Sequence, residues 1–164
     1  MSDALKAVPA SDKIDTGITG VTAIAKGLSE ALADTYRLLF KSHAVHWNVE
    51  GPMFHSIHVV TEAQYTDLFQ AADDLAERIR ALGQIAPFQL AEITKMSCLT
   101  DPAKLGSAQV MVEDLATDHA SVARRMRDLI GQAEKGEDVA TADLLTARCA
   151  FHEKSAWMLR ATAK

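Results

Sequence analysis

The stretch HAVHWNVEGPMFHSIH, residues 43–58, holds four of the chain's six histidines and carries Gly51-Pro52 near its middle. Apolar residues recur at helical spacing on both sides of it. Glycine followed by proline stops a helix, because proline lacks a backbone N–H and its ring clashes with the preceding turn. The stretch therefore predicts a reversal between two long helices, with histidines on both arms.

Four long helices are predicted, over residues 18–49, 54–82, 107–133 and 140–163. The less regular connection between the second and third contains Pro87 and Pro102 and is expected to hold one short helix. Residues 1–17 are polar and aperiodic, which predicts a flexible N-terminal tail ahead of a single domain over residues 18–164. The pattern indicates an all-α protein built as a four-helix bundle.

Composition and charge argue against several classes of protein. Hydrophobic residues make up 48% of the 164 and aromatic residues 5%, and the formal net charge is -5, which disfavours a large basic surface for nucleic acid. The N-terminus does not resemble a signal peptide and no run of about 18 apolar residues occurs, so a cytoplasmic protein is expected. Cys98 and Cys149 lack C-x-x-C spacing; reduced thiols are expected, with a single disulfide as the alternative.

The histidines on the two arms of the reversal suggest a metal site. His46 and His58 each lie six residues from Pro52, so an antiparallel hairpin brings them to the same level. Glu62 follows His58 by four residues, on the same face one turn along. Two imidazoles and a carboxylate form a ligand set suited to a divalent transition metal.

A second pair of acids, Asp73 and Glu77, lies further along the same predicted helix. Because a helix rises about 1.5 Å per residue, the separation of Asp73 from His58 is about 22 Å, too far for one metal within one chain. Two copies of the helix crossing antiparallel about a two-fold axis would bring the two sets together. The alternative is a solvated face on which these acids pair with Arg78 or Arg80, or with nearby lysines.

The segments HWNVEGPMFHSIH, DDLAERIRALG and DVATADLLTARCAFHEKSAWMLRA, with Glu62 between the first two, closely resemble the Dps family of miniferritins, the DNA-binding proteins from starved cells. The resemblance runs from about Leu28 to Ala161. It implies a ferritin-like four-helix subunit with a short helix between the second and third helices. It also implies a hollow dodecamer, with an intersubunit di-iron-type ferroxidase centre at each two-fold interface.

The resemblance further implies roles for individual residues. One subunit and its two-fold partner together supply the ligands, namely His46, His58 and Glu62 from one chain and Asp73 and Glu77 from the other. Many members have Asp at position 62, and the longer Glu here keeps a hard oxygen ligand. Trp47 is expected to trap oxidising equivalents, whereas His43 and His55 are expected not to bind metal.

The implied reaction oxidises two Fe(II) ions per hydrogen peroxide and deposits ferric mineral in the shell, with zinc or manganese as possible substitutes for iron. Acids at one three-fold axis are expected to line an iron uptake pore. Asp143 matches that position, and Asp138 and Glu153 are weaker candidates. For Asp143 alone, the alternative is an acid that interacts favourably with the helix dipole near a helix N-terminus.

Two other functions remain open. One is a nucleoid-compacting DNA-binding protein, although direct DNA binding is not expected, because Lys6 and Lys13 in the tail are outnumbered by aspartates and phosphate binding needs a dense cationic surface. The other is a cage that only sequesters zinc or manganese. A conventional bacterioferritin is disfavoured, since the third and fourth helices lack an E-x-x-H motif.

Overall fold

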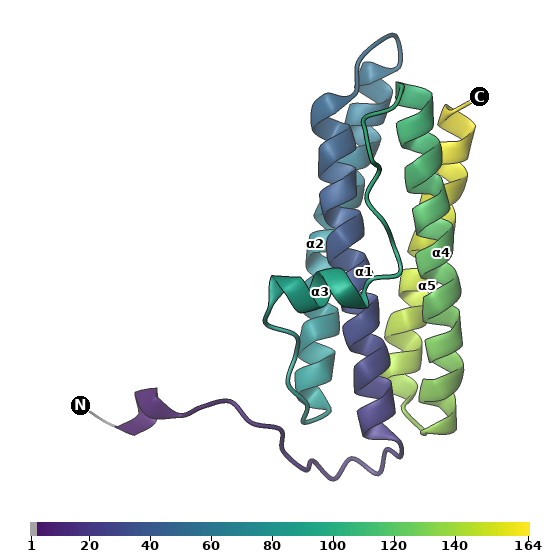
Figure 1. The fold of residues 1–164 in the computed structure, drawn as a ribbon. Coiled ribbons are helices and arrows are strands. Elements are labelled where there is room, and N and C mark those ends of the chain that lie inside the picture. The colour runs from purple at the N-terminus through teal and green to yellow at the C-terminus, as the bar shows by residue number, and fades with distance from the viewer. Residues whose placement is uncertain (1–2) are drawn as a thin grey trace.

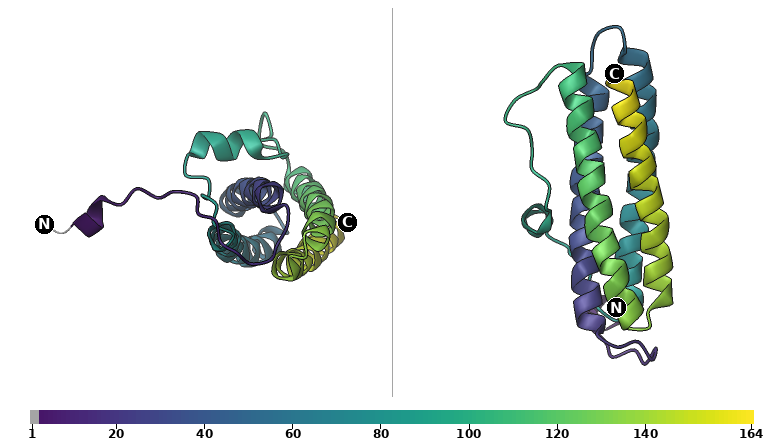
Figure 2. Two further views of the ribbon diagram at one scale, coloured as in Figure 1. Left: turned by 90° about the horizontal axis from the view of Figure 1, so that it is seen from below. Right: turned by 90° about the vertical axis from the view of Figure 1, so that its right-hand side faces the viewer.

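The computed structural model describes residues 3–164, and the four-helix bundle predicted from the sequence is confirmed. Its elements are a short 3-10 helix η1 (Asp3–Lys6) and the α-helices α1 (Val21–Asn48), α2 (Phe54–Ala81), α3 (Leu90–Met96), α4 (Ala108–Lys135) and α5 (Val139–Thr162). The hairpin of α1 and α2 lies beside the hairpin of α4 and α5 (Figure 1). The short helix α3 lies in the long connection and crosses the outside of the bundle (Figure 2).

Local signals in the sequence explain where the helices begin and end. Gly83 follows α2 with φ of 77°, a left-handed conformation that glycine adopts without steric cost. The Ser107 side chain accepts a hydrogen bond from a backbone N–H in the first turn of α4. The Asp138 carboxylate does the same for the backbone N–H of Thr141 at the start of α5, at 2.9 Å. The observed boundaries of the four long helices differ from the predicted ones by only a few residues.

An apolar core fills the space between the four long helices. Its largest fully buried aliphatic side chains are Ile24, Leu28, Leu32, Leu38, Leu68, Leu75, Ile79, Leu115, Met126, Leu145 and Leu159. Burying one such side chain stabilises the fold by about 1.5–3 kcal/mol before entropy is counted. The helices are therefore rigid enough to fix the positions of polar groups on their outer faces.

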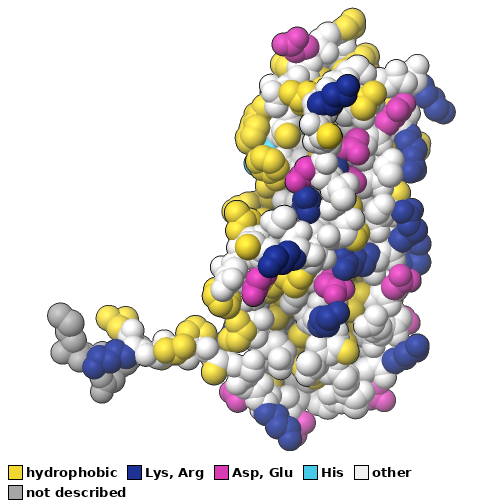
Figure 3. All heavy atoms as spheres, viewed as in Figure 1, with side chains coloured by type: hydrophobic (Ala, Val, Ile, Leu, Met, Phe, Trp, Pro, Cys, Tyr) yellow, Lys and Arg dark blue, Asp and Glu magenta, His cyan; other side chains and the backbone are white. Residues whose placement is uncertain are grey.

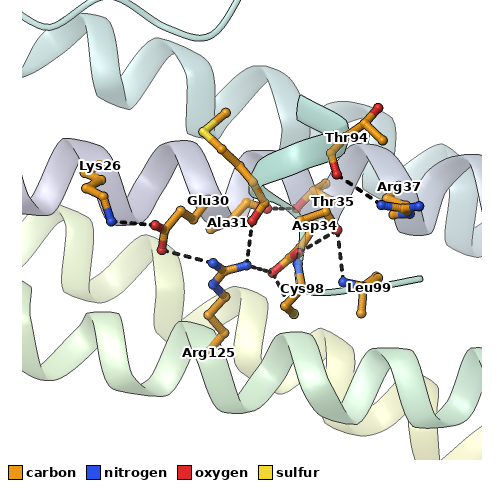
Figure 4. Close-up of polar contacts among 12 residues, drawn as sticks. Lys26, Glu30, Ala31, Asp34, Thr35, Arg37, Thr94, Cys98, Leu99 and Arg125 are labelled. Carbon is orange, nitrogen blue, oxygen red and sulfur yellow. Dashed lines mark hydrogen bonds and ion pairs between the residues drawn. The ribbon is translucent and has the colours of Figure 1, made fainter. Parts of the chain in front are cut away.

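A buried carboxylate ties the long connection to the bundle (Figure 4). Asp34 on α1 accepts hydrogen bonds from the Ser97 hydroxyl at 2.8 Å and the Cys98 backbone N–H at 2.7 Å. Arg125 on α4 reaches the same carboxylate at 2.9 Å. Burial, followed by the charge of Asp34, raises the pKa of the Cys98 thiol. Cys98 and Cys149 are both free, as expected.

The N-terminal segment extends away from the foot of the bundle (Figures 1 and 2). The part of the predicted tail that lies outside the described residues is 1–2. The remainder is not wholly irregular, because η1 forms one short helix and the Asp12 backbone N–H donates to the Gly83 carbonyl at 2.7 Å. Between residues 3 and 164, no helix is long and apolar enough to cross a membrane.

Candidate metal centre

His46, near the end of α1, and His58, near the start of α2, face each other across the helical hairpin. Their imidazole rings stack with centroids 3.6 Å apart and planes 18° apart. The Nδ1 atom of each ring lies 2.9 Å from the backbone carbonyl oxygen of the other residue. A carbonyl oxygen only accepts, so Nδ1 carries the proton in both rings and Nε2 carries the lone pair. Hydrogen bonding thus leaves both Nε2 atoms available as metal ligands.

Glu62 lies one turn after His58 on α2, and its side chain is exposed. The structure therefore places His46, His58 and Glu62 at one end of the hairpin. Across residues 3–164 of a single chain, however, no three His, Cys, Asp or Glu side chains lie close enough together to hold a metal ion. A complete site needs ligands from elsewhere, as the intersubunit interpretation requires.

The side chains of Asp73 and Glu77 are exposed and form no hydrogen bond or ion pair with the described part of the chain. The neighbouring arginines point elsewhere. Arg78 donates to the Asp138 carboxylate at 2.6 Å, and Arg80 donates to a backbone carbonyl. The alternative in which these arginines pair with Asp73 and Glu77 is therefore wrong. Both carboxylates are therefore without a hydrogen-bond or ion-pair partner within residues 3–164.

The face that carries the candidate ligands is unusually apolar for an exposed surface. Tyr36, Phe40 and Trp47 recur along α1 at spacings of four and seven residues, and Phe69 on α2 is 68% exposed. Hydrophobic side chains gather along this side of the molecule in Figure 3. Large exposed aromatic groups on one helix face are typical of an interface with another chain.

Two further side chains lie against the histidine pair. His43 and Tyr65 are half-buried, with ring centroids 4.0 Å apart, and Tyr65 meets His46 edge-on at 5.2 Å. Burial, followed by the nearby His46, lowers the pKa of His43. Tyr65 was not among the site residues predicted from the sequence. Its position seven residues after His58, two turns along the same helix face, was the available signal.

The three acids expected at an uptake pore have different surroundings. Asp143 is exposed on α5. Asp138 is buried, where it caps α5 and binds Arg78, so it is not available to line a pore. Glu153 is exposed and pairs with Arg127 across α4 and α5.

A second histidine pair lies inside the bundle. The Nδ1 atoms of His119 on α4 and His152 on α5 are 2.9 Å apart, and both residues are fully buried. Burial lowers the pKa of His119 to about 3 and that of His152 well below its usual value. Within residues 3–164 no third His, Cys, Asp or Glu side chain lies close enough to this pair to hold a metal ion with it.

Comparison with known proteins gives a consistent result. The family described as the ferritin-like domain matches residues 25–164. The DNA protection during starvation protein 2 of Bacillus anthracis is 34% identical over 134 residues, which cover 82% of this chain and 92% of that protein. The crystal structure of Dps from Staphylococcus aureus has a TM-score of 0.84 at 30% identity, covering 94% of this chain and 99% of that chain.

The chain belongs to the Dps family of ferritin-like proteins. A Dps protein from Vibrio cholerae O1, described as a member of a broad superfamily of ferritin-like diiron-carboxylate proteins, is 26% identical with a TM-score of 0.83. The similarity covers 88% of this chain and 91% of that one. Membership of the Dps family supports a role in iron binding, storage and protection.

Proposed function

We propose that this Dps protein is a cytoplasmic ferroxidase that oxidises Fe(II), preferably with hydrogen peroxide, and stores the ferric product in a shell of twelve copies. The observation that carries the proposal is the pair formed by His46 and His58. The Nδ1–H of each ring donates a hydrogen bond to a backbone carbonyl oxygen. Both Nε2 lone pairs are thereby left for metal. Glu62 adds a carboxylate from the same chain, and Asp73 and Glu77 of a second copy complete the set.

The ligand set suits the proposed reaction. Imidazole and carboxylate donors bind Fe(II) with open positions for an oxidant, and the carboxylates favour the harder Fe(III) product. Two Fe(II) ions, one hydrogen peroxide and two protons give two Fe(III) ions and two waters, so hydroxyl radical is not released. Iron is the substrate here. Zinc or manganese would occupy the same ligands without turning over.

The positions of the exposed aromatic residues support a two-fold arrangement. If His58 and Glu62 of one chain meet Asp73 and Glu77 of another, two α2 helices must cross antiparallel with the axis near the midpoint of these four residues. Phe69 lies close to that midpoint and is exposed. Burying it against its own copy would remove apolar surface from water at the centre of the interface.

Asp143 is the acid proposed to guide iron into the shell. It is exposed on α5, so copies arranged about a three-fold axis would present several carboxylates and concentrate Fe(II) there. Asp143→Asn is expected to slow mineral growth while leaving oxidation of the first Fe(II) ions unchanged.

The deciding experiment is anaerobic loading with Fe(II) followed by peroxide, monitored by ferric absorbance. It compares the native protein with a His46→Ala, His58→Ala double variant and with a His55→Ala control, since His55 is an exposed histidine from the same stretch. All three are checked for assembly by size. Loss of rapid oxidation in the assembled double variant alone supports the proposal. Equal rates in all three would overturn it.

A further inference from the structure

A groove of about 370 Å³ lies between α4 and α5, on the hairpin that does not carry the candidate metal ligands. Three arginines line it, Arg124 and Arg127 from α4 and Arg160 from α5, together with a single acid, Glu153. Lys and Arg side chains recur along this edge of the molecule (Figure 3). The two helices therefore present guanidinium groups to the groove from both of its sides.

The positive charge of the groove is only partly neutralised. Arg127 forms an ion pair with Glu153 across the two helices. Arg124 donates a hydrogen bond to the uncharged Ser121 hydroxyl at 2.9 Å. The Arg160 side chain has no hydrogen-bond or ion-pair partner within residues 3–164. An anion that enters the groove thus meets two positive charges that no acid in the lining neutralises, in a chain whose formal net charge is -5.

Small side chains leave room between the two helices. Ala123 and Ala156 are buried in the lining of the groove, and Ala120 is half-buried beside them. The volume lies near the lower end of the range for small-molecule sites, about 300–1,000 Å³, and exceeds what one phosphate ion needs. Among residues 3–164, none that lines the groove is aromatic, so a nucleobase would find no ring to stack on.

We propose that this groove binds condensed inorganic phosphate, with the linked phosphates lying between the arginines of α4 and Arg160 of α5. A guanidinium group matches the oxygens of a phosphate with two parallel N–H···O bonds, and it stays charged at every physiological pH. A short phosphate chain carries several negative charges in a row, which suits cationic groups on both walls of one groove. The site uses neither iron nor the histidine pair, so it is independent of the proposed ferroxidase function.

Calorimetric titration of metal-free, assembled protein with tripolyphosphate at low salt tests the proposal. Arg160→Gln and Arg124→Gln should each weaken binding by about tenfold, whereas Arg160→Lys, which keeps the charge but loses the planar fork, should weaken it less. Glu153→Gln should strengthen binding, because it removes the one acid in the lining. Lys154→Gln removes an exposed charge of α5 that does not line the groove, so this control should bind as the native protein does. Absence of saturable binding to the native protein would overturn the proposal.

Other occupants of the groove would give different results. If it holds carboxylates of a neighbouring copy, Arg160→Gln should sediment as smaller species with no phosphate present. If it is part of a general nucleic-acid surface, a short single-stranded DNA oligonucleotide should bind as tightly as tripolyphosphate and lose affinity in the same variants. Either result would refute the assignment. Orthophosphate should bind more weakly than tripolyphosphate, since it reaches fewer arginines, and equal affinities would contradict a site for a phosphate chain.

Discussion

His46 and His58 hold each other's imidazole in place, because the Nδ1–H of each ring donates to the backbone carbonyl oxygen of the other residue at 2.9 Å. The acceptor is backbone in both cases, so replacing one side chain leaves the surviving ring oriented. We expect His46→Ala or His58→Ala to weaken Co(II) binding by about 10–100-fold, and the double variant to abolish it. Anaerobic calorimetric titration measures this. A single variant that binds Co(II) as weakly as the double variant would show that the two rings are not independently oriented.

Phe69 should control assembly without affecting the fold of one chain. Its ring is exposed at the proposed crossing point of two α2 helices, so Phe69→Asp would place two carboxylates against each other there. We expect the variant to remain helical by circular dichroism but to sediment as smaller species, with ferroxidase activity lost. Leu5→Asp, which changes an even more exposed apolar residue in the N-terminal segment, is the control and should assemble normally. A Phe69→Asp shell of full size would contradict the two-fold arrangement.

Mixed shells test whether one site is shared between two chains. A variant lacking His46 and His58 and a variant lacking Asp73 and Glu77 should each be inactive. Reassembled together, a heterodimer has one site with all five ligands and one that keeps only Glu62, because each site draws His46, His58 and Glu62 from one chain and Asp73 and Glu77 from the other. Random mixing should recover roughly a quarter of the native rate. If the sites lay within single chains, mixing would recover nothing.

Much of the fold and part of the site could be predicted from sequence because they depend on spacing. The equal distances of His46 and His58 from Pro52 place the two rings at one level whatever their rotamers. Gly83 and the prolines of the long connection likewise determine where helices stop. These features follow from backbone geometry, which local sequence controls closely.

Contacts between helices were harder to predict, because they depend on how each helix is rotated about its axis. Arg78 lies beside Glu77 in sequence but turns away to bind Asp138, which was one of the two weaker pore candidates predicted from the sequence. Thr141, three residues after Asp138, was a usable sign of a helix cap. Nothing in the spacing showed that Tyr65 would touch both His43 and His46, since that contact depends on the packing of α1 against α2.

Asp34 should contribute more to stability than an exposed acid on the same side of the bundle. Asp34→Asn removes the charge that faces Arg125 inside the protein, although Arg125 keeps a second partner in Glu30 at 3.0 Å. We therefore expect the free energy of unfolding, measured with urea, to fall by about 3 kcal/mol, near the lower end of the range for breaking a buried ion pair. Asp101→Asn, which removes an exposed carboxylate paired with Arg37, should cost less than about 1 kcal/mol. Equal losses of unfolding free energy in the two variants would mean that burial of Asp34 does not determine its contribution to stability.

The buried pair of His119 and His152 should make the protein sensitive to acid. Burial lowers the pKa of His119 from 6.5 to about 3, and His152 shifts in the same direction. Below about pH 6.5 the unfolded chain therefore takes up protons that the folded chain does not, and the free energy of unfolding falls as the pH drops towards 3.

Each histidine contributes at most about 1.4 kcal/mol per pH unit over that range. Replacing both, as in His119→Leu with His152→Leu, should flatten the dependence of urea-unfolding midpoints on pH below neutrality. The exposed His55→Ala is the control and should leave the slope unchanged. The same slope in the double leucine variant would show that other groups, and not this pair, cause the loss of stability in acid.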